Sequence, residues 1–124
     1  MTTPGAQALL DEIEAKRGYV LDMHRVLAEH DPDFLRGYET LIDAAYVRDG
    51  ALDRRTKEFV YVAALVALSA PRPQVVAHMK AALEAGATAQ ELLQVVEQLM
   101  PPVGVPRFIE GLEAWGQACR KGSA

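Results

Sequence analysis

Residues 59–70 read FVYVAALVALSA and form the most apolar stretch of the chain. The stretch contains no charged residue, glycine or proline, and four charged side chains precede it directly within residues 54–58. A helix that crosses a bilayer needs about 20 apolar residues, so this run is too short to span a membrane. It therefore predicts a central helix that is buried in a globular fold.

Apolar residues recur at helical spacing on both sides of this run, and proline and glycine divide them into segments. Gly18 and Gly86 are expected to end helices, because glycine adopts the left-handed conformation of a helix end at no steric cost. Asp31 is expected to begin a helix as its N-cap. Thr88 is expected to do the same in a capping box with Glu91, in which each side chain accepts from a backbone amide of the first turn.

The expected helices cover about residues 6–16, 20–29, 32–46, 52–70, 73–85, 89–99 and 106–118. The second of these is expected to continue the first or to stand alone, and the prolines at 101 and 102 are expected to end the helix before them. Period-2 alternation typical of strands is almost absent. The chain is therefore predicted to be all-α, a single-domain bundle of about six helices.

Length and charge restrict the partners of the chain. A chain of 124 residues fits one domain, here 1–124, with a core over about 30–118 and flexibility expected in the first few residues and in the tail from Lys121. The net charge of −4 leaves no excess of cations for nucleic acid or an anionic membrane, so a small molecule or another protein chain is the expected partner. The first residues lack the features of a secretory signal, which predicts the cytoplasm.

Three stretches occur in the order typical of one protein family. Residues 50–58 (GALDRRTKE) match a G-x-L-x-x-[RK]-x-[RK]-E entry to a central helix, and residues 78–92 (HMKAALEAGATAQEL) match H-x-x-x-A-L-x-x-G-[AV]-[ST]-x-x-E-[IL] at every marked position. Residues 104–106 (GVP) resemble the G-x-P turn before the last helix. Over about residues 30–118 the chain thus resembles the carboxymuconolactone decarboxylase superfamily, whose fold is that of alkyl hydroperoxidase D.

This resemblance implies an all-helical fold built on a helical hairpin, and homo-oligomers that are trimers or hexamers. One branch of the superfamily decarboxylates γ-carboxymuconolactone without a metal or organic cofactor. The other branch reduces peroxides through a C-x-x-C-x-x-x-H motif, whose histidine corresponds to His78. The two cysteine positions hold Pro71 and Gln74 here, and neither side chain forms a thiolate or a disulfide. We therefore expect no thiol peroxidase activity.

Glu58 and His78 are the predicted catalytic pair. Antiparallel packing of their two helices brings a carboxylate to an imidazole, and such a contact fixes the ring tautomer and raises its basicity, as general acid–base catalysis requires. The alternative is structural: Glu58 as a partner of the helix dipole and His78 as a core histidine bonded to a backbone carbonyl. The resemblance favours the first interpretation, because both positions match functional residues of the family.

A carboxylated substrate also needs a cation, and Arg55, Arg72 and Arg107 are the candidate substrate-binding residues. No metal site is expected, because no two histidines stand four residues apart and no other ligand array occurs. His24 and the only cysteine, Cys119, are left open as groups that reach the pocket of a neighbouring subunit. A single cysteine also excludes an intrachain disulfide.

Two functions remain open at this stage. The first is a cofactor-free acid–base enzyme, a decarboxylase-like lyase acting on a small carboxylated or lactone substrate through His78 and Glu58. The second is a non-catalytic binding or assembly module that retained the helical scaffold, since a fold does not by itself define a function. A hydrogen bond between the two side chains in a cavity open to solvent favours the enzyme, and a dry core around both favours the module.

Overall fold

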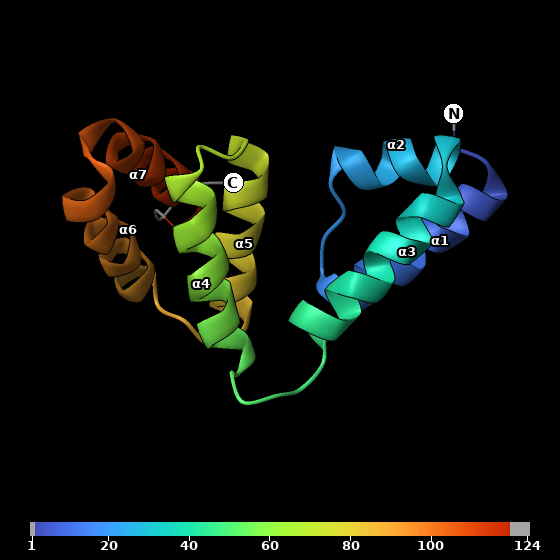
Figure 1. Cartoon of the computed structure of the whole chain (residues 1–124), viewed down its shortest axis with the longest axis horizontal. Coiled ribbons are helices and arrows are strands. Elements are labelled where there is room, and N and C mark those ends of the chain that lie inside the picture. Colours follow the sequence, from blue (N-terminus) through green and yellow to red (C-terminus); the bar gives the residue numbers. More distant parts are fainter. Residues whose placement is uncertain (1, 120–124) are drawn as a thin grey trace. The chain divides into compact units, whose positions relative to one another are not determined.

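The computed structural model describes residues 2–119, all of whose regular elements are helices. The chain divides into two compact units, Met1–Gly50 and Ala51–Ala124 (Figure 1). The elements are α1 (Pro4–Arg17), α2 (Asp22–His30), α3 (Pro32–Ile42), the π-helix η1 (Asp43–Val47), α4 (Arg54–Ala67), α5 (Arg72–Glu84), α6 (Ala89–Val103) and α7 (Val105–Cys119). The all-α prediction is confirmed, with seven α-helices among the described residues in place of about six.

Short sequence signals delimit the helices of the N-terminal unit. The hydroxyl of Thr3 accepts from the amide of Ala6 at the start of α1, and Gly18 ends this helix in the left-handed conformation, with φ of 86°. The carboxylate of Asp31 accepts from the amide of Phe34 at the start of α3, as the sequence predicts. Helices α1 and α2 are therefore separate elements.

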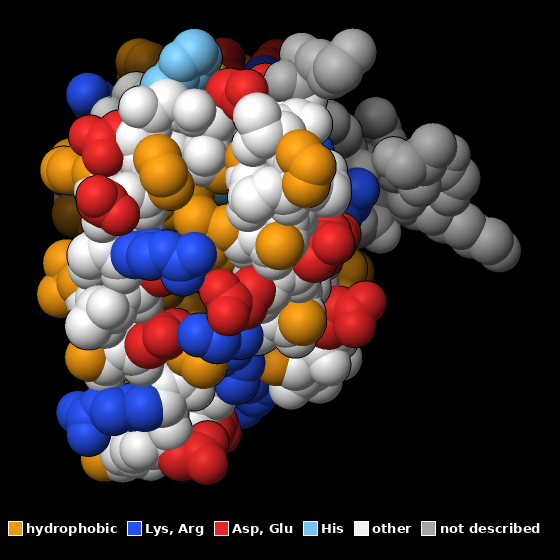
Figure 2. All heavy atoms as spheres, turned by 90° about the vertical axis from the view of Figure 1, so that its right-hand side faces the viewer, with side chains coloured by type: hydrophobic (Ala, Val, Ile, Leu, Met, Phe, Trp, Pro, Cys, Tyr) orange, Lys and Arg blue, Asp and Glu red, His pale blue; other side chains and the backbone are white. Residues whose placement is uncertain are grey.

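The N-terminal unit has a small apolar core of its own, to which α1 contributes most. Its buried members are Ala6, Leu9, Leu10, Ile13, Ala28 and Leu35. A groove of about 240 Å³ between α1 and α3 is lined by apolar and charged side chains. Figure 2 faces this unit and shows acidic and basic side chains interleaved across it. One ion pair spanning the groove joins Lys16 to Asp43, at 3.1 Å.

The C-terminal unit is built on the hairpin of α4 and α5, which run side by side in Figure 1. Helices α6 and α7 form a second antiparallel pair that packs against the hairpin. The shared core contains Val62, Val66, Val75, Val76, Met79, Ala82, Ala87, Leu92, Val96 and Ala114. The hairpin that the resemblance implies is therefore present.

Gly111 allows α7 to approach the other helices of this unit closely. A Cβ atom built at Gly111 would lie 2.9 Å from a methyl group of Val96 and 3.0 Å from one of Val66. Such distances are shorter than ordinary van der Waals contact, so any side chain here would force the helices apart. The glycine thus fixes the spacing of α4, α6 and α7.

Helix α4 is less buried than its composition predicts. Glu58, Val62 and Val66 are buried along one face of α4, whereas Val60 on another face is 54% exposed and Leu68, the C-cap residue, is 74% exposed. Within its own unit the helix therefore packs on one side. Among residues 2–119, no helix combines the length and hydropathy that crossing a membrane requires.

Two segments differ from the expected helix boundaries. Helix α6 continues through Pro101 and Pro102 to Val103, so the prolines do not end it as expected. Each proline removes the hydrogen bond that its amide would donate to the carbonyl four residues earlier, but the helix ends at Val103 and no further turn follows them. The expected helix over 32–46 changes at Asp43 into the π-helix η1, where the amide of Arg48 bonds the carbonyl of Asp43. The expected flexible tail from Lys121 lies outside the described residues.

Candidate active site

Glu58 and His78 meet inside the hairpin of the C-terminal unit. Glu58 lies in the second turn of α4 and His78 in the middle of α5. The Nδ1 atom of His78 lies 2.7 Å from Oε1 of Glu58, within hydrogen-bond distance. Glu58 is fully buried and His78 is 5% exposed, so water competes little for this contact. The first condition for an acid–base pair, direct contact, is met.

This contact links the tautomer of His78 to the protonation state of Glu58. An ionised carboxylate only accepts hydrogen bonds, so an ionised Glu58 requires the ring proton on Nδ1. In the neutral ring, Nε2 then holds the lone pair that takes up a proton. The ring of Tyr61 lies beside the imidazole, with the centroids 5.0 Å apart and the planes tilted by 34°. The pair is thus oriented from two sides.

Arg54 is the residue of this site that the sequence analysis missed. Its Nε donates to Oε2 of Glu58 over 2.9 Å, while Oε1 of the same carboxylate faces His78. The side chain of Arg54 is 31% exposed, and it reaches the fully buried carboxylate from the first turn of α4. The signal was the spacing of four residues between Arg54 and Glu58, which places the two side chains on one face of a helix.

Arg55 is turned towards another partner. Its Nη1 donates to Oε2 of Glu91 over 2.6 Å, and its guanidinium lies 5.2 Å from the ring centroid of Phe59. Glu91 also accepts from the amide of Thr88, which completes the predicted capping box. The Thr88 amide and then Arg55 hold the pKa of Glu91 below its ordinary value. Arg55 thereby connects α4 to the start of α6.

The other two candidate arginines lie apart from the pair. Arg72, at the start of α5, donates to Glu110 and Glu113 of α7, and these hydrogen bonds raise the pKa of its guanidinium. Arg107 is exposed in the first turn of α7. The structure brings together Glu58, His78 and Arg54, but not these two side chains.

The positions that hold thiols in the peroxidase branch lie at the start of α5. Pro71 is the N-cap residue of this helix and Gln74 follows in its first turn. Cys119 lies at the end of α7, where it is partly buried against the C-terminal core. Burial raises the pKa of its thiol to about 11, so the group is protonated at neutral pH and is a poor nucleophile.

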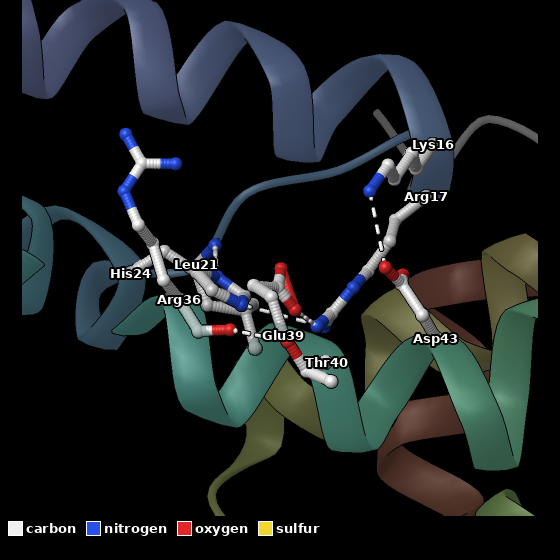
Figure 3. A network of polar contacts seen from close by, with 8 residues as sticks. All are labelled: Lys16, Arg17, Leu21, His24, Arg36, Glu39, Thr40 and Asp43. Carbon is white, nitrogen blue, oxygen red and sulfur yellow. Dashed lines mark hydrogen bonds and ion pairs between the residues drawn. The ribbon is translucent and has the colours of Figure 1, made fainter. Parts of the chain in front are cut away.

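His24 belongs to a second polar cluster, which lies in the N-terminal unit (Figure 3). Arg17 lies at its centre: Nη2 donates to Oε2 of Glu39, and Nη1 lies 3.3 Å from Nε2 of His24. The amide of Leu21 donates to Nδ1 of the same ring over 2.9 Å. His24 is 1% exposed, and both of these partners belong to its own unit.

Within residues 2–119, no group of three or more His, Cys, Asp or Glu side chains is arranged to hold a metal ion. The described side chains that meet at the candidate site are the imidazole of His78, the carboxylate of Glu58 and the guanidinium of Arg54, with the ring of Tyr61 beside them. This set can move a proton and can orient an anion.

Comparison with protein families agrees with this architecture. The model of the carboxymuconolactone decarboxylase family matches residues 32–117, which include the whole hairpin and both members of the Glu58–His78 pair. The chain belongs to the carboxymuconolactone decarboxylase family. No curated protein and no solved structure matched the chain.

Proposed function

We propose that the chain is a cofactor-free acid–base enzyme, a decarboxylase-like lyase that acts on a small carboxylated or lactone substrate. The hydrogen bond of 2.7 Å between His78 and Glu58 is the observation that carries this proposal. A buried carboxylate that orients an imidazole is a typical arrangement for proton transfer near neutral pH. Membership of the family supports the reaction class.

The proposed reaction uses His78 as the proton carrier. The bond between the substrate carbon and its carboxylate breaks, carbon dioxide leaves, and the electron pair remains on carbon as an enolate or carbanion. Protonated His78 then donates the proton on Nε2 to this carbon, and the ring takes up one proton from the solvent, so the net reaction consumes one proton for each carbon dioxide released. Glu58 stabilises the imidazolium form through the hydrogen bond at Nδ1.

Arg55 is our first candidate for holding the substrate carboxylate. It precedes Glu58 by three residues, a spacing that places both side chains on the same side of α4. Its ion pair with Glu91 is partly exposed, at 38% and 43%, and exposed pairs contribute only about 0–1 kcal/mol. A substrate anion can therefore compete for this guanidinium. Arg72 and Arg107 are weaker candidates, because Arg72 is paired with α7 and Arg107 is at the exposed start of that helix.

The test uses carbon dioxide release from 4-carboxymuconolactone and from a panel of small β-keto and unsaturated carboxylic acids. His78→Ala should lower kcat of any substrate found by about a hundredfold or more, because general acid–base groups contribute about 10²–10⁴-fold. His30→Ala, which removes an exposed histidine at the end of α2, is the matched control and should leave kcat unchanged. Equal rates for the two variants would contradict the role of His78.

A non-catalytic module of the same fold is the second candidate, and the burial of the pair favours it. The side chains of Glu58 and His78 are 0% and 6% exposed, which is the environment expected of a structural core pair. The two candidates differ in how His78 reacts with diethyl pyrocarbonate. Modification of His78 at a rate within about tenfold of that of exposed His30 supports the enzyme, because an active site must admit small molecules. Protection of His78 until the chain unfolds supports the module.

We also propose that the chain forms a homo-oligomer, a trimer or a hexamer. The exposed apolar side chains of Val60 in α4 and Leu68 at its C-cap support this proposal, since exposed apolar patches mark association surfaces. Native mass spectrometry should give three or six chains. Leu68→Glu should shift the distribution towards the monomer, whereas Lys80→Glu, an exposed change on α5, should not.

A further inference from the structure

The two oxygens of the buried Glu58 carboxylate have different partners. Oε2 accepts from Nε of Arg54 over 2.9 Å, and Oε1 faces Nδ1 of His78 at 2.7 Å. The carboxylate is fully buried, the imidazole is nearly so, and the side chain of Arg54 is about one-third exposed. A permanent cation at the edge of the site thus contacts an anion in its interior.

Burying an ionised carboxylate costs several kcal/mol unless a charged partner and hydrogen bonds compensate for the lost water. Arg54 provides both, because its guanidinium remains protonated at all ordinary pH values. An imidazole alone is a weaker partner, since it is neutral over much of the ordinary pH range. Arg54 therefore favours the ionised form of Glu58.

The state of Glu58 in turn defines the state of His78. An ionised carboxylate accepts hydrogen bonds only, so it requires a proton on Nδ1 of the ring. A protonated carboxyl group could instead donate to Nδ1 and leave the ring proton on Nε2. Which of these neutral tautomers is present decides whether Nε2 can accept a proton.

We propose that Arg54 is a positioning residue that keeps Glu58 an acceptor and thereby fixes His78 as the Nδ1–H tautomer, with Nε2 as the reacting nitrogen. The catalytic consequence of this inference rests on the proposed function, whereas the tautomer of His78 can be measured without a substrate. Arg54 acts through Glu58 and needs no contact with substrate.

The tautomer can be measured by long-range ¹H–¹⁵N correlation spectra of the full chain labelled at histidine, recorded above pH 7. The His78→Ala spectrum assigns the His78 signals among the three histidines. The wild-type chain should show a protonated Nδ1 and an unprotonated Nε2 at His78. Arg54→Ala should change the tautomer ratio by roughly tenfold or more towards Nε2–H, the scale of a hydrogen bond to a charged group.

Two further variants separate this role from general stabilisation. Arg54→Lys keeps the charge and should restore much of the wild-type ratio. Lys80→Ala removes an exposed cation two residues from His78 on the same helix and should leave the ratio unchanged. If Arg54→Ala fails to fold, Arg54→Gln, which retains an N–H donor without the charge, replaces it and should shift the ratio in the same direction.

An unchanged ratio in folded Arg54→Ala or Arg54→Gln would overturn the positioning role, as would a wild-type ring already protonated at Nε2. The result is independent of turnover. If the ratio shifts as expected but His78→Ala leaves kcat intact, the positioning role stands and the proposed function fails. If His78→Ala abolishes turnover and the ratio does not shift, the proposed function stands and the role of Arg54 fails.

Discussion

The two units of the chain each bury a cluster of one arginine, one glutamate and one histidine, and the clusters differ in which residue is central. In the C-terminal unit Glu58 is central and contacts both Arg54 and His78. In the N-terminal unit the central residue is Arg17, which contacts both Glu39 and His24 (Figure 3). The same three residue types therefore place the imidazole beside an anion in one unit and beside a cation in the other.

The central residue determines what each imidazole can do. At His78, Nδ1 lies 2.7 Å from a carboxylate oxygen, which can accept a hydrogen bond from a ring proton. At His24 both ring nitrogens face N–H groups, those of Leu21 and Arg17. A second proton on this ring would therefore point at an N–H donor, which disfavours the charged form. Burial, followed by the charges of Arg17 and Arg25, lowers the pKa of His24 to about 4. Under the proposed function, the C-terminal cluster transfers the proton and the N-terminal cluster is structural.

Breaking the N-terminal cluster should have the largest effect on stability. The side chains of Arg17 and Glu39 are 5% and 12% exposed, and removing one partner of a buried pair costs about 3–5 kcal/mol. We expect Arg17→Met to lower the free energy of unfolding by this amount, measured by urea denaturation. Lys16→Met is the matched control, because its pair with Asp43 is exposed and should contribute less than about 1 kcal/mol. Equal losses in the two variants would show that the buried pair contributes no more to the free energy of unfolding than the exposed pair.

The titration of His24 should give the next largest effect. Its pKa is about 4 in the folded chain against an ordinary 6.5, so between these values the unfolded chain binds more protons and stability falls as the pH falls. The loss should begin near pH 6.5 and reach up to about 3 kcal/mol near pH 4. Unfolding curves at several pH values should show this slope in wild type and a flatter one in His24→Asn. His30→Asn should retain the wild-type slope, and a slope equal in all three chains would argue against His24 as its source.

Replacing glycine by alanine should change the free energy of unfolding in opposite directions at two positions, one in each unit. Gly111→Ala should destabilise the chain by about 1–3 kcal/mol, because the new methyl group meets Val96 and Val66 at about 3 Å. Gly37→Ala, within α3, meets no atom within 4 Å and should stabilise the chain by about 0.5–1 kcal/mol through helix propensity. Thermal unfolding of both variants tests the pair. A gain at Gly111 would mean that α7 can move away at no cost.

Much of the fold is predictable from the sequence because the residues that begin and end its helices act locally. Gly18, Gly86 and the Thr88 capping box act within one turn, and all three appear where the sequence places them. The π-helix at Asp43–Val47 was not predicted, since the helix ends in that turn and no later turn shows the shift of the apolar pattern that an extra residue causes. The division into two compact units was not predicted either, because no linker and no change of composition marks it in the sequence. The single-domain organisation stays a prediction.

The site was predictable in part for the same reason. The contact between Glu58 and His78 follows from the hairpin and from the family motifs around both residues. Arg54 was missed because its position is variable in the motif, and the cluster of Arg17 and His24 was missed because it depends on packing between helices rather than on spacing. The family motifs thus located a pair on two helices, whereas the packed structure was needed to reveal the partner of Glu58 on its own helix and the cluster around Arg17.

The carboxylate of Glu91 links the motif at its own helix start to Arg55, which lies 36 residues earlier in the chain. Oε1 of Glu91 accepts from the amide of Thr88, and Oε2 accepts from Arg55 in the first turn of α4. The first turn of α4 and the N-terminus of α6 are therefore held together by this one carboxylate. In chimaeras between members of this family, the residues at positions 55 and 91 should come from the same parent. A crossover between these positions would pair Arg55 with a foreign residue at 91, or Glu91 with a foreign residue at 55.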